Sequence, residues 1–436
     1  MHKFFVRFSL LILVLAIVPA LALAQAGKPD ALKIAVITFT SGSGGVVGGP
    51  SVNSAKLTID RINAAGGIDG VPIEATYIDE AGGASKNVTT FRQVADDVDV
   101  VIGYVSSSDC LAVAPVAEAL QQPTIFSACT TNKLFAGHDY QWVFRSQPPV
   151  SANALATALY IAKTQPDIKS IAGLNQDYAF GRGSWKYFAA AMHALRPDVK
   201  LGPAIFTKLF SGHYSSQVSR LLLQRPDMIY SSFWGGDLLA LVQQGMARGL
   251  YDSTQVVLGL GTQAGVDGLK LMPAGVIASA EHSLLFHPGG FGGNKALTAY
   301  IAAYRERFDQ YPASTYPYTT RRAILAIRDG YEKAIAANDG AWPSKARFVA
   351  ALEGLKVDTL MGPMVIRENH QATYHEVVGV SVHTEEYPFA VFNHVIRFPA
   401  DMIMPPKGTT DVEAWIASLT PAILDKVPEP TNYLAE

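Results

Sequence analysis

Small hydroxylated residues gather in loops that follow predicted strands. The loop Ser106-Ser107-Ser108-Asp109 follows an apolar strand at 100–103, and residues 127–132 follow another at 124–126. A third loop, at 41–49, is rich in glycine and serine. Hydroxyl groups and free backbone N–H groups at a helix N-terminus bind an anion without a full positive charge. Helix capping by Ser and Asp would explain one such loop, but three at one sheet edge favour a site for a carboxylate.

Aromatic residues occupy the equivalent positions in the second half of the chain. Asp177-Tyr178-Ala179-Phe180-Gly181 follows one predicted strand, and Ser232-Phe233-Trp234-Gly235-Gly236 follows another. Aromatic side chains more often pack in the core than contact a ligand. Here they come directly after strands and adjoin glycines, which favours the rim of a cleft.

Motifs for catalysis or cofactor binding are weak in this chain. Residues 259–264 (Gly-Leu-Gly-Thr-Gln-Ala) follow a strand, and Glu281 lies about twenty residues further on, as in a dinucleotide-binding turn. The motif is short and late in the chain. The loop at 41–49 lacks a Gly-Lys-Ser/Thr ending, and we find neither G-x-S-x-G nor H-E-x-x-H. The histidine pairs are spaced i, i+5, which does not align two metal ligands on one helical face: His282 with His287, and His370 with His375. We therefore expect no enzyme, cofactor or metal; an exported enzyme or NAD-type oxidoreductase using 259–264 stays as the distant alternative.

Short apolar strands alternate with amphipathic helices along the chain. Strands are predicted at 33–37, 73–78, 98–103, 123–126, 170–174, 228–230, 255–258 and 275–280, with later ones at 364–366 and 376–382. Helices are predicted at 51–63, 85–95, 109–120, 181–195, 237–248, 295–308, 319–337 and 345–355. Continuous apolar strands separated by helices indicate parallel sheets covered on both faces. Two such α/β units meet near Arg145-Ser146-Gln147-Pro148-Pro149, so we expect two doubly wound lobes with a cleft between them.

The composition and the N-terminus indicate an exported protein. The 436 residues carry 35 Lys+Arg and 37 Asp+Glu, a net charge of −2, and this excludes an electrostatic nucleic-acid binder. Lys3 and Arg7 precede the apolar run Leu10–Val18 and the small-residue site Ala22-Leu23-Ala24. This is the pattern of a cleaved signal peptide at 1–24; an N-terminal membrane anchor is the less favoured reading, because the run is short.

Cys110 and Cys129 are the two cysteines of the chain. An even count in an exported protein favours a disulfide, and two buried free thiols are the alternative.

Several stretches resemble the periplasmic solute-binding proteins of ABC transporters, in the leucine/isoleucine/valine-binding (type I) group. The most specific is 61–73 (Arg-Ile-Asn-Ala-Ala-Gly-Gly-Ile-Asp-Gly-Val-Pro-Ile), followed by Asp79. Shorter matches are Val101-Ile102-Gly103, Phe144-Arg145-Ser146, Tyr178–Gly181, Pro226–Tyr230 and Met361–Met364. The resemblance implies an α/β fold of two doubly wound lobes joined by a three-crossover hinge. One lobe would comprise 28–147 plus 284–357, and the other 148–283 plus 358–436.

The resemblance also implies a set of ligand-binding residues. Ser107, with Ser108 beside it, matches the serine that holds a ligand carboxylate, Cys129 a backbone contact, and Thr131 a hydroxyl contact. The remaining expected contacts are Tyr178, Phe180, Phe233, Trp234, Gly261 and Thr262.

One departure from the family pattern affects the ligand. In the amino-acid binders an acidic residue after the strand at 256–258 holds the ligand ammonium, and here that stretch has no carboxylate. Without a substitute such as Asp109, Asp177 or Glu281, an ammonium would be buried without a counter-charge. We therefore expect a small organic carboxylate, aromatic or branched aliphatic, as the ligand. A branched-chain or other amino acid, an amide or urea is the alternative. The resemblance further implies a monomer in the periplasm that delivers its ligand to an inner-membrane ABC permease.

Overall fold

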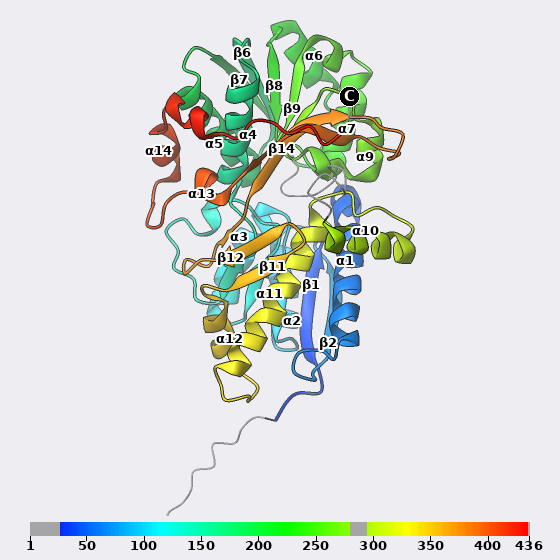
Figure 1. The fold of residues 1–436 in the computed structure, drawn as a ribbon, viewed down its shortest axis with the longest axis vertical. Coiled ribbons are helices and arrows are strands. Elements are labelled where there is room, and N and C mark those ends of the chain that lie inside the picture. The colour runs from blue at the N-terminus through cyan, green and yellow to red at the C-terminus, as the bar shows by residue number, and fades with distance from the viewer. Residues whose placement is uncertain (1–26, 280–293, 435–436) are drawn as a thin grey trace, which may run out of the picture.

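The chain folds into two α/β lobes stacked along the long axis of the molecule (Figure 1). The computed structural model describes residues 27–279 and 294–434. The predicted signal peptide, Glu281, His282 and His287 lie outside the described residues. Within those residues, no helix is long and apolar enough to cross a bilayer, and no group of acidic, His or Cys side chains is arranged to hold a metal.

The first lobe is built on a five-stranded parallel sheet in the order β2-β1-β3-β4-β5. Its strands are β1 (Leu32–Thr38), β2 (Ile73–Asp79), β3 (Val100–Gly103), β4 (Thr124–Phe126) and β5 (Val143–Arg145). Its helices are α1 (Gly45–Ala64), α2 (Ala84–Ala95), α3 (Ser107–Ala119), α10 (Lys295–Phe308), α11 (Tyr316–Ala336) and α12 (Lys345–Leu352), with short 3₁₀ turns η1 (Gly42–Gly44) and η2 (Asn132–Leu134).

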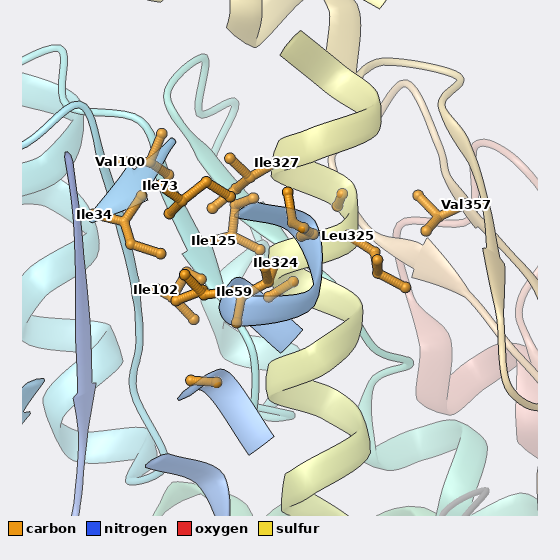
Figure 2. Packing of buried hydrophobic residues seen from close by; sticks show 14 of the residues in the cluster. Ile34, Ile59, Ile73, Val100, Ile102, Ile125, Ile324, Leu325, Ile327 and Val357 are labelled. Atoms are coloured by element: carbon orange, nitrogen blue, oxygen red, sulfur yellow. The ribbon is translucent and has the colours of Figure 1, made fainter. Parts of the chain in front are cut away.

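Both faces of this sheet are buried, as the uninterrupted apolar strands predict. Along β1, Ile34 and Val36 join the core beneath α1 and α11, whereas Ala35 and Ile37 join the core beneath α2 and α3. Figure 2 shows the first core, in which branched side chains of several strands meet those of both helices: Ile34, Ile73, Val100, Ile102 and Ile125 from the sheet, with Ile59, Ile324 and Ile327 from the helices.

The second lobe is built on a seven-stranded sheet in the order β15-β14-β10-β9-β8-β6-β7. Its elements are α4 (Val150–Thr164), β6 (Ser170–Gln176), α5 (Ala179–Leu195), β7 (Lys200–Thr207), α6 (Ser215–Gln224), β8 (Met228–Ser231), α7 (Gly235–Met246), α8 (Leu250–Ser253), β9 (Gln255–Leu258), η3 (Gly261–Ala264), α9 (Gly265–Leu271), β10 (Ile277–Ser279), β14 (Glu376–Val382), β15 (Val391–Phe398), α13 (Ala400–Ile403), α14 (Val412–Ala417) and η4 (Pro421–Lys426). Strands β6 to β10 are parallel, and β14 and β15 add an antiparallel edge.

The chain passes between the lobes three times. β5 is followed by α4 of the second lobe, β10 by α10 of the first, and β13 by β14 of the second. The predicted class, two α/β lobes with parallel sheets and a three-crossover hinge, is confirmed. A small antiparallel sheet of β11 (Lys356–Thr359), β12 (Gly362–Ile366) and β13 (Ala372–Thr373) precedes the third passage. Met364 and Ile366 of β12 join the first lobe's core, so these strands pack with that lobe, although 358–436 was expected in the second.

Cys110 and Cys129 form a disulfide in the structure, with their Cα atoms 6.4 Å apart. The bond joins the first turn of α3 to the loop after β4, and both residues are fully buried. It therefore ties together two loops at the carboxyl end of the first sheet.

Replacing both cysteines by serine should lower the free energy of unfolding by about 3 kcal/mol, because the bond joins residues 19 positions apart and so closes a loop in the unfolded chain. Urea unfolding followed by circular dichroism measures the change. A thiol assay on denatured, unreduced protein should find no free thiol; two free thiols would contradict the bond.

Candidate functional site

A cavity lies between the lobes, at the carboxyl ends of their parallel strands. In open parallel sheets this edge is where ligands bind. The first lobe supplies residues that follow β3 and β4 and residues at the start of α11; the second lobe supplies residues that follow β6, β8 and β9. The cavity is lined by Val105, Ala128, Thr130, Gln147, Tyr178, Phe180, Trp234, Leu260, Gln263, Thr315, Tyr316 and Thr319.

An aromatic cluster forms one wall of this cavity. The Trp234 indole N–H donates a hydrogen bond of 2.6 Å to the Tyr178 hydroxyl, and the rings of Tyr178 and Phe180 lie 6.0 Å apart. Phe39 of the first lobe contacts Trp234, at 6.0 Å between ring centroids, and Phe210 at 5.7 Å. These rings join the two lobes, so the structure has the cleft closed.

The polar side chains of the cavity are hydroxyls and amides. No Asp, Glu, Lys, Arg or His is among the described residues that line it. The side chains of Thr130 and Gln147 make no hydrogen bond within the described part of the chain, although Gln147 is only 2% exposed. These two groups therefore have hydrogen-bonding capacity left for a ligand.

Glu80 holds the loop after β3 from behind. Its side chain is fully buried and accepts backbone N–H bonds from Val105, at 2.9 and 3.0 Å, and from Ser106, at 2.8 Å. Asp109, which is also buried, hydrogen-bonds to it. Burial, and then the neighbouring Asp109 charge, hold the pKa of Glu80 well above its usual value. Burial likewise raises the pKa of Asp109. Both shifts favour the protonated form of a carboxyl in this buried pair.

Arg145 holds the loop after β4 in a similar way. Its guanidinium is fully buried and donates to the carbonyl oxygens of Thr131, at 2.9 Å, and Cys129, at 3.5 Å. A further bond reaches the side-chain oxygen of Gln371, next to β13. Burial lowers the pKa of Arg145. This residue connects the loop that carries Thr130 to the small sheet at the hinge.

Among the predicted ligand-binding residues, Tyr178, Phe180 and Trp234 line the cavity together. Phe233 does not: the chain is extended here, so its ring points the other way and packs 4.6 Å from Tyr214 in the core. Thr262 meets the Thr315 hydroxyl at 3.3 Å, and a Cβ on Gly261 would lie 2.4 Å from that of Ala278. Both therefore lie behind the cavity wall.

The predicted hydroxyl residues of the first lobe also lie beside the cavity rather than on its wall. Ser107 is 1% exposed at the start of α3, and Cys129 is in the disulfide. The Thr131 hydroxyl accepts the Lys133 N–H at 3.3 Å and so caps η2. Ser108 faces a second pocket, lined also by Ser41–Gly44 and Phe210.

None of the non-aromatic wall residues was among the predicted ligand contacts. Ala128 and Thr130 lie in the predicted loop 127–132, and Val105 directly precedes the predicted loop 106–109, so the loops were found but not the exact side chains. Thr315, Tyr316 and Thr319 come from the start of α11, which carries no local signal for a ligand site.

Two α/β lobes with a cavity closed between them define a bilobal binding protein. A family model described as periplasmic binding protein matches residues 31–384. The chain therefore belongs to the periplasmic binding protein family, and its fold is the type I fold of that family.

Individual relatives agree with this assignment. The Leu/Ile/Val/Thr-binding protein of Salmonella typhimurium is 26% identical over 357 residues, covering 79% of this chain and 89% of that protein. A solute-binding protein of an ABC transporter from Rhodopseudomonas palustris, in complex with 3,4-dihydroxybenzoic acid, has a TM-score of 0.75 at 21% identity, covering 87% of this chain and 100% of that one. A leucine-binding protein from Thermotoga maritima has a TM-score of 0.70 at 18% identity, covering 85% and 99%.

Replacing Glu80 with glutamine should leave the fold intact and flatten the pH dependence of stability. The raised pKa means that folding keeps a proton which the unfolded chain releases, so this stabilisation is complete below the usual carboxyl pKa and declines as pH rises. The glutamine amide keeps an acceptor for the N–H groups and a donor for Asp109 at every pH. Alanine leaves those N–H groups buried and unpaired, costing about 2 kcal/mol or more.

Thermal unfolding between pH 5 and pH 8 measures both effects. Glu74→Gln on the exposed side of β2 is the matched control and should keep the wild-type slope. A wild-type slope in Glu80→Gln would show that protonation of Glu80 does not contribute to the pH dependence of stability.

Proposed function

We propose that this protein is the periplasmic solute-binding component of an ABC importer. It captures a small organic carboxylate, aromatic or branched aliphatic, between its lobes and delivers it to an inner-membrane permease. The observation that carries the ligand class is the cavity itself: aromatic and aliphatic walls, hydroxyl and amide groups, and no acidic side chain among its described residues.

The described walls fit a carboxylate better than a zwitterion. The Thr130 hydroxyl and the Gln147 amide can each donate a hydrogen bond to a carboxylate oxygen, and the rings of Phe180 and Trp234 can cover an apolar body. An α-ammonium group would have no counter-charge in these walls, and a buried unpaired charge is costly. Solute-binding proteins of similar fold from Rhodopseudomonas palustris were crystallised with benzoate and with 4-hydroxybenzoate, which supports the aromatic class.

A branched-chain amino acid is the second candidate. The relatives in Salmonella typhimurium and Escherichia coli are named for leucine, isoleucine and valine, at 26% identity. These names favour an amino acid, whereas the lack of a charged side chain among the described residues of the cavity opposes it.

Ligand binding closes the cleft by a population shift, since the ligand touches both lobes only in the closed form. Closure brings the Gly235-Gly236 start of α7 against the η1 turn of the first lobe. A Cβ on Gly236 would lie 3.1 Å from both the Cβ and the carbonyl oxygen of Ser43. Glycine at this position therefore lets the two lobes meet.

Calorimetry on refolded, ligand-free protein should show tight binding of benzoate or a hydroxybenzoate and none of leucine. Thr130→Val, which keeps the shape and removes the hydroxyl, should weaken that binding about tenfold or more, because hydrogen bonds to charged groups contribute about 1.5–3 kcal/mol. Thr89→Val on the exposed side of α2 is the control and should bind like wild type. Tight leucine binding without any for aromatic acids would overturn the ligand assignment.

Gly236→Ala should weaken the binding of the ligand that calorimetry identifies. The melting temperature of the ligand-free protein should stay equal or rise. Alanine favours the helix locally, while its methyl group obstructs closure. Small-angle scattering with saturating ligand should show a larger radius of gyration than wild type. Gly49→Ala in α1, where a Cβ meets nothing within 4 Å, is the matched control. Equal affinity in both variants would contradict the closure contact.

A further inference from the structure

A separate cavity, of about 270 Å³, opens between α1 and α11 of the first lobe, away from the interlobe cleft. Three arginines line it: Arg61 from α1, and Arg321 and Arg328 from α11. Its remaining walls are mostly apolar or small, with one acidic residue: Leu57, Thr58, Ile62, Ala65, Gly67, Tyr300, Leu325 and Glu332.

The arginines of this cavity are only partly neutralised. Arg328 pairs with its neighbour Asp329 at 2.6 Å. Arg61 donates a long bond, 3.5 Å, to the Ala299 carbonyl oxygen, and Arg321 lies over the Tyr300 ring at 5.7 Å. Neither Arg61 nor Arg321 forms an ion pair within the described part of the chain.

The three arginines share one cavity, and like charges repel one another. Arg321 is partly buried, and burial lowers its pKa; the neighbouring Tyr300 opposes that shift, while the charges of Arg328 and Arg61 add to it. An anion in the cavity would offset that repulsion and complete the hydrogen bonding of the guanidinium groups. The planar N–H fork of arginine matches the oxygens of a phosphate or sulfate.

We propose that this cavity binds an oxyanion of the phosphate type, held by Arg61 and Arg321 with Arg328 at its edge. The apolar floor of Leu57, Ile62 and Leu325 leaves room for a small organic group on that anion. The site is independent of the interlobe ligand and adds a second binding function to the first lobe.

Equilibrium dialysis with radiolabelled inorganic phosphate, at constant ionic strength, tests the site directly. We expect saturable binding of about one phosphate per chain. Arg321→Gln and Arg61→Gln should each weaken phosphate binding at least tenfold. Arg92→Gln, on the exposed side of α2, is the control and should not change it. Circular dichroism of each variant confirms that it is folded; two independent variants keep the test valid if one of them unfolds.

Two competition experiments distinguish inorganic phosphate from an organic phosphate as the anion, and this cavity from the interlobe cavity. Glycerol phosphate should compete with inorganic phosphate at similar or higher affinity, because the floor accepts an organic group. Saturating benzoate should not compete. Phosphate binding that is unsaturable, equal in all variants, or displaced by benzoate would overturn the site.

Discussion

The architecture depends on burying both faces of two parallel sheets. In the first lobe, α1 and α11 cover one face of the sheet, and α2 and α3 cover the other, so neither face of the sheet is open. Only the strand ends remain, and the two lobes turn their carboxyl ends toward each other. The contact of Phe39 with Trp234 closes the space between them. The cavity is therefore a product of lobe packing and belongs to neither sheet alone.

Buried titratable side chains support the loops of the cavity from behind. Glu80 and Arg145 are fully buried, and each holds the backbone of one loop that contributes to the cavity. The disulfide from Cys110 joins the same two loops. Such supports fix the positions of Val105 and Thr130, while the described residues that line the cavity are uncharged. A small number of buried polar groups thus shapes the site without lining it.

Much of the fold followed from local patterns. The helix at 295–308 and the strand at 376–382 have the predicted bounds, because their apolar spacing is unambiguous. The helix α4 had no such signal: nearly every residue from Val150 to Ala162 is buried, so no polar face marks the helical period. The lobe to which β12 belongs likewise could be decided only from the structure, because the sequence of this strand does not indicate which lobe its apolar residues pack against.

The sequence by itself indicated that the loops after β3 and β4 reach the cleft and that Tyr178, Phe180 and Trp234 follow strands of the second lobe. The third predicted loop, 41–49, contributes instead to a separate pocket. Only the tertiary structure decided which side chains reach the cavity. Adjacent residues of an extended loop point in opposite directions, so a shift of one position separates Thr130, on the cavity wall, from the predicted Thr131. The start of α11 enters the site from a segment far away in sequence, and no local spacing encodes that proximity. It arises because burying the apolar side of α11 on the first sheet brings its N-terminus to the gap between the lobes.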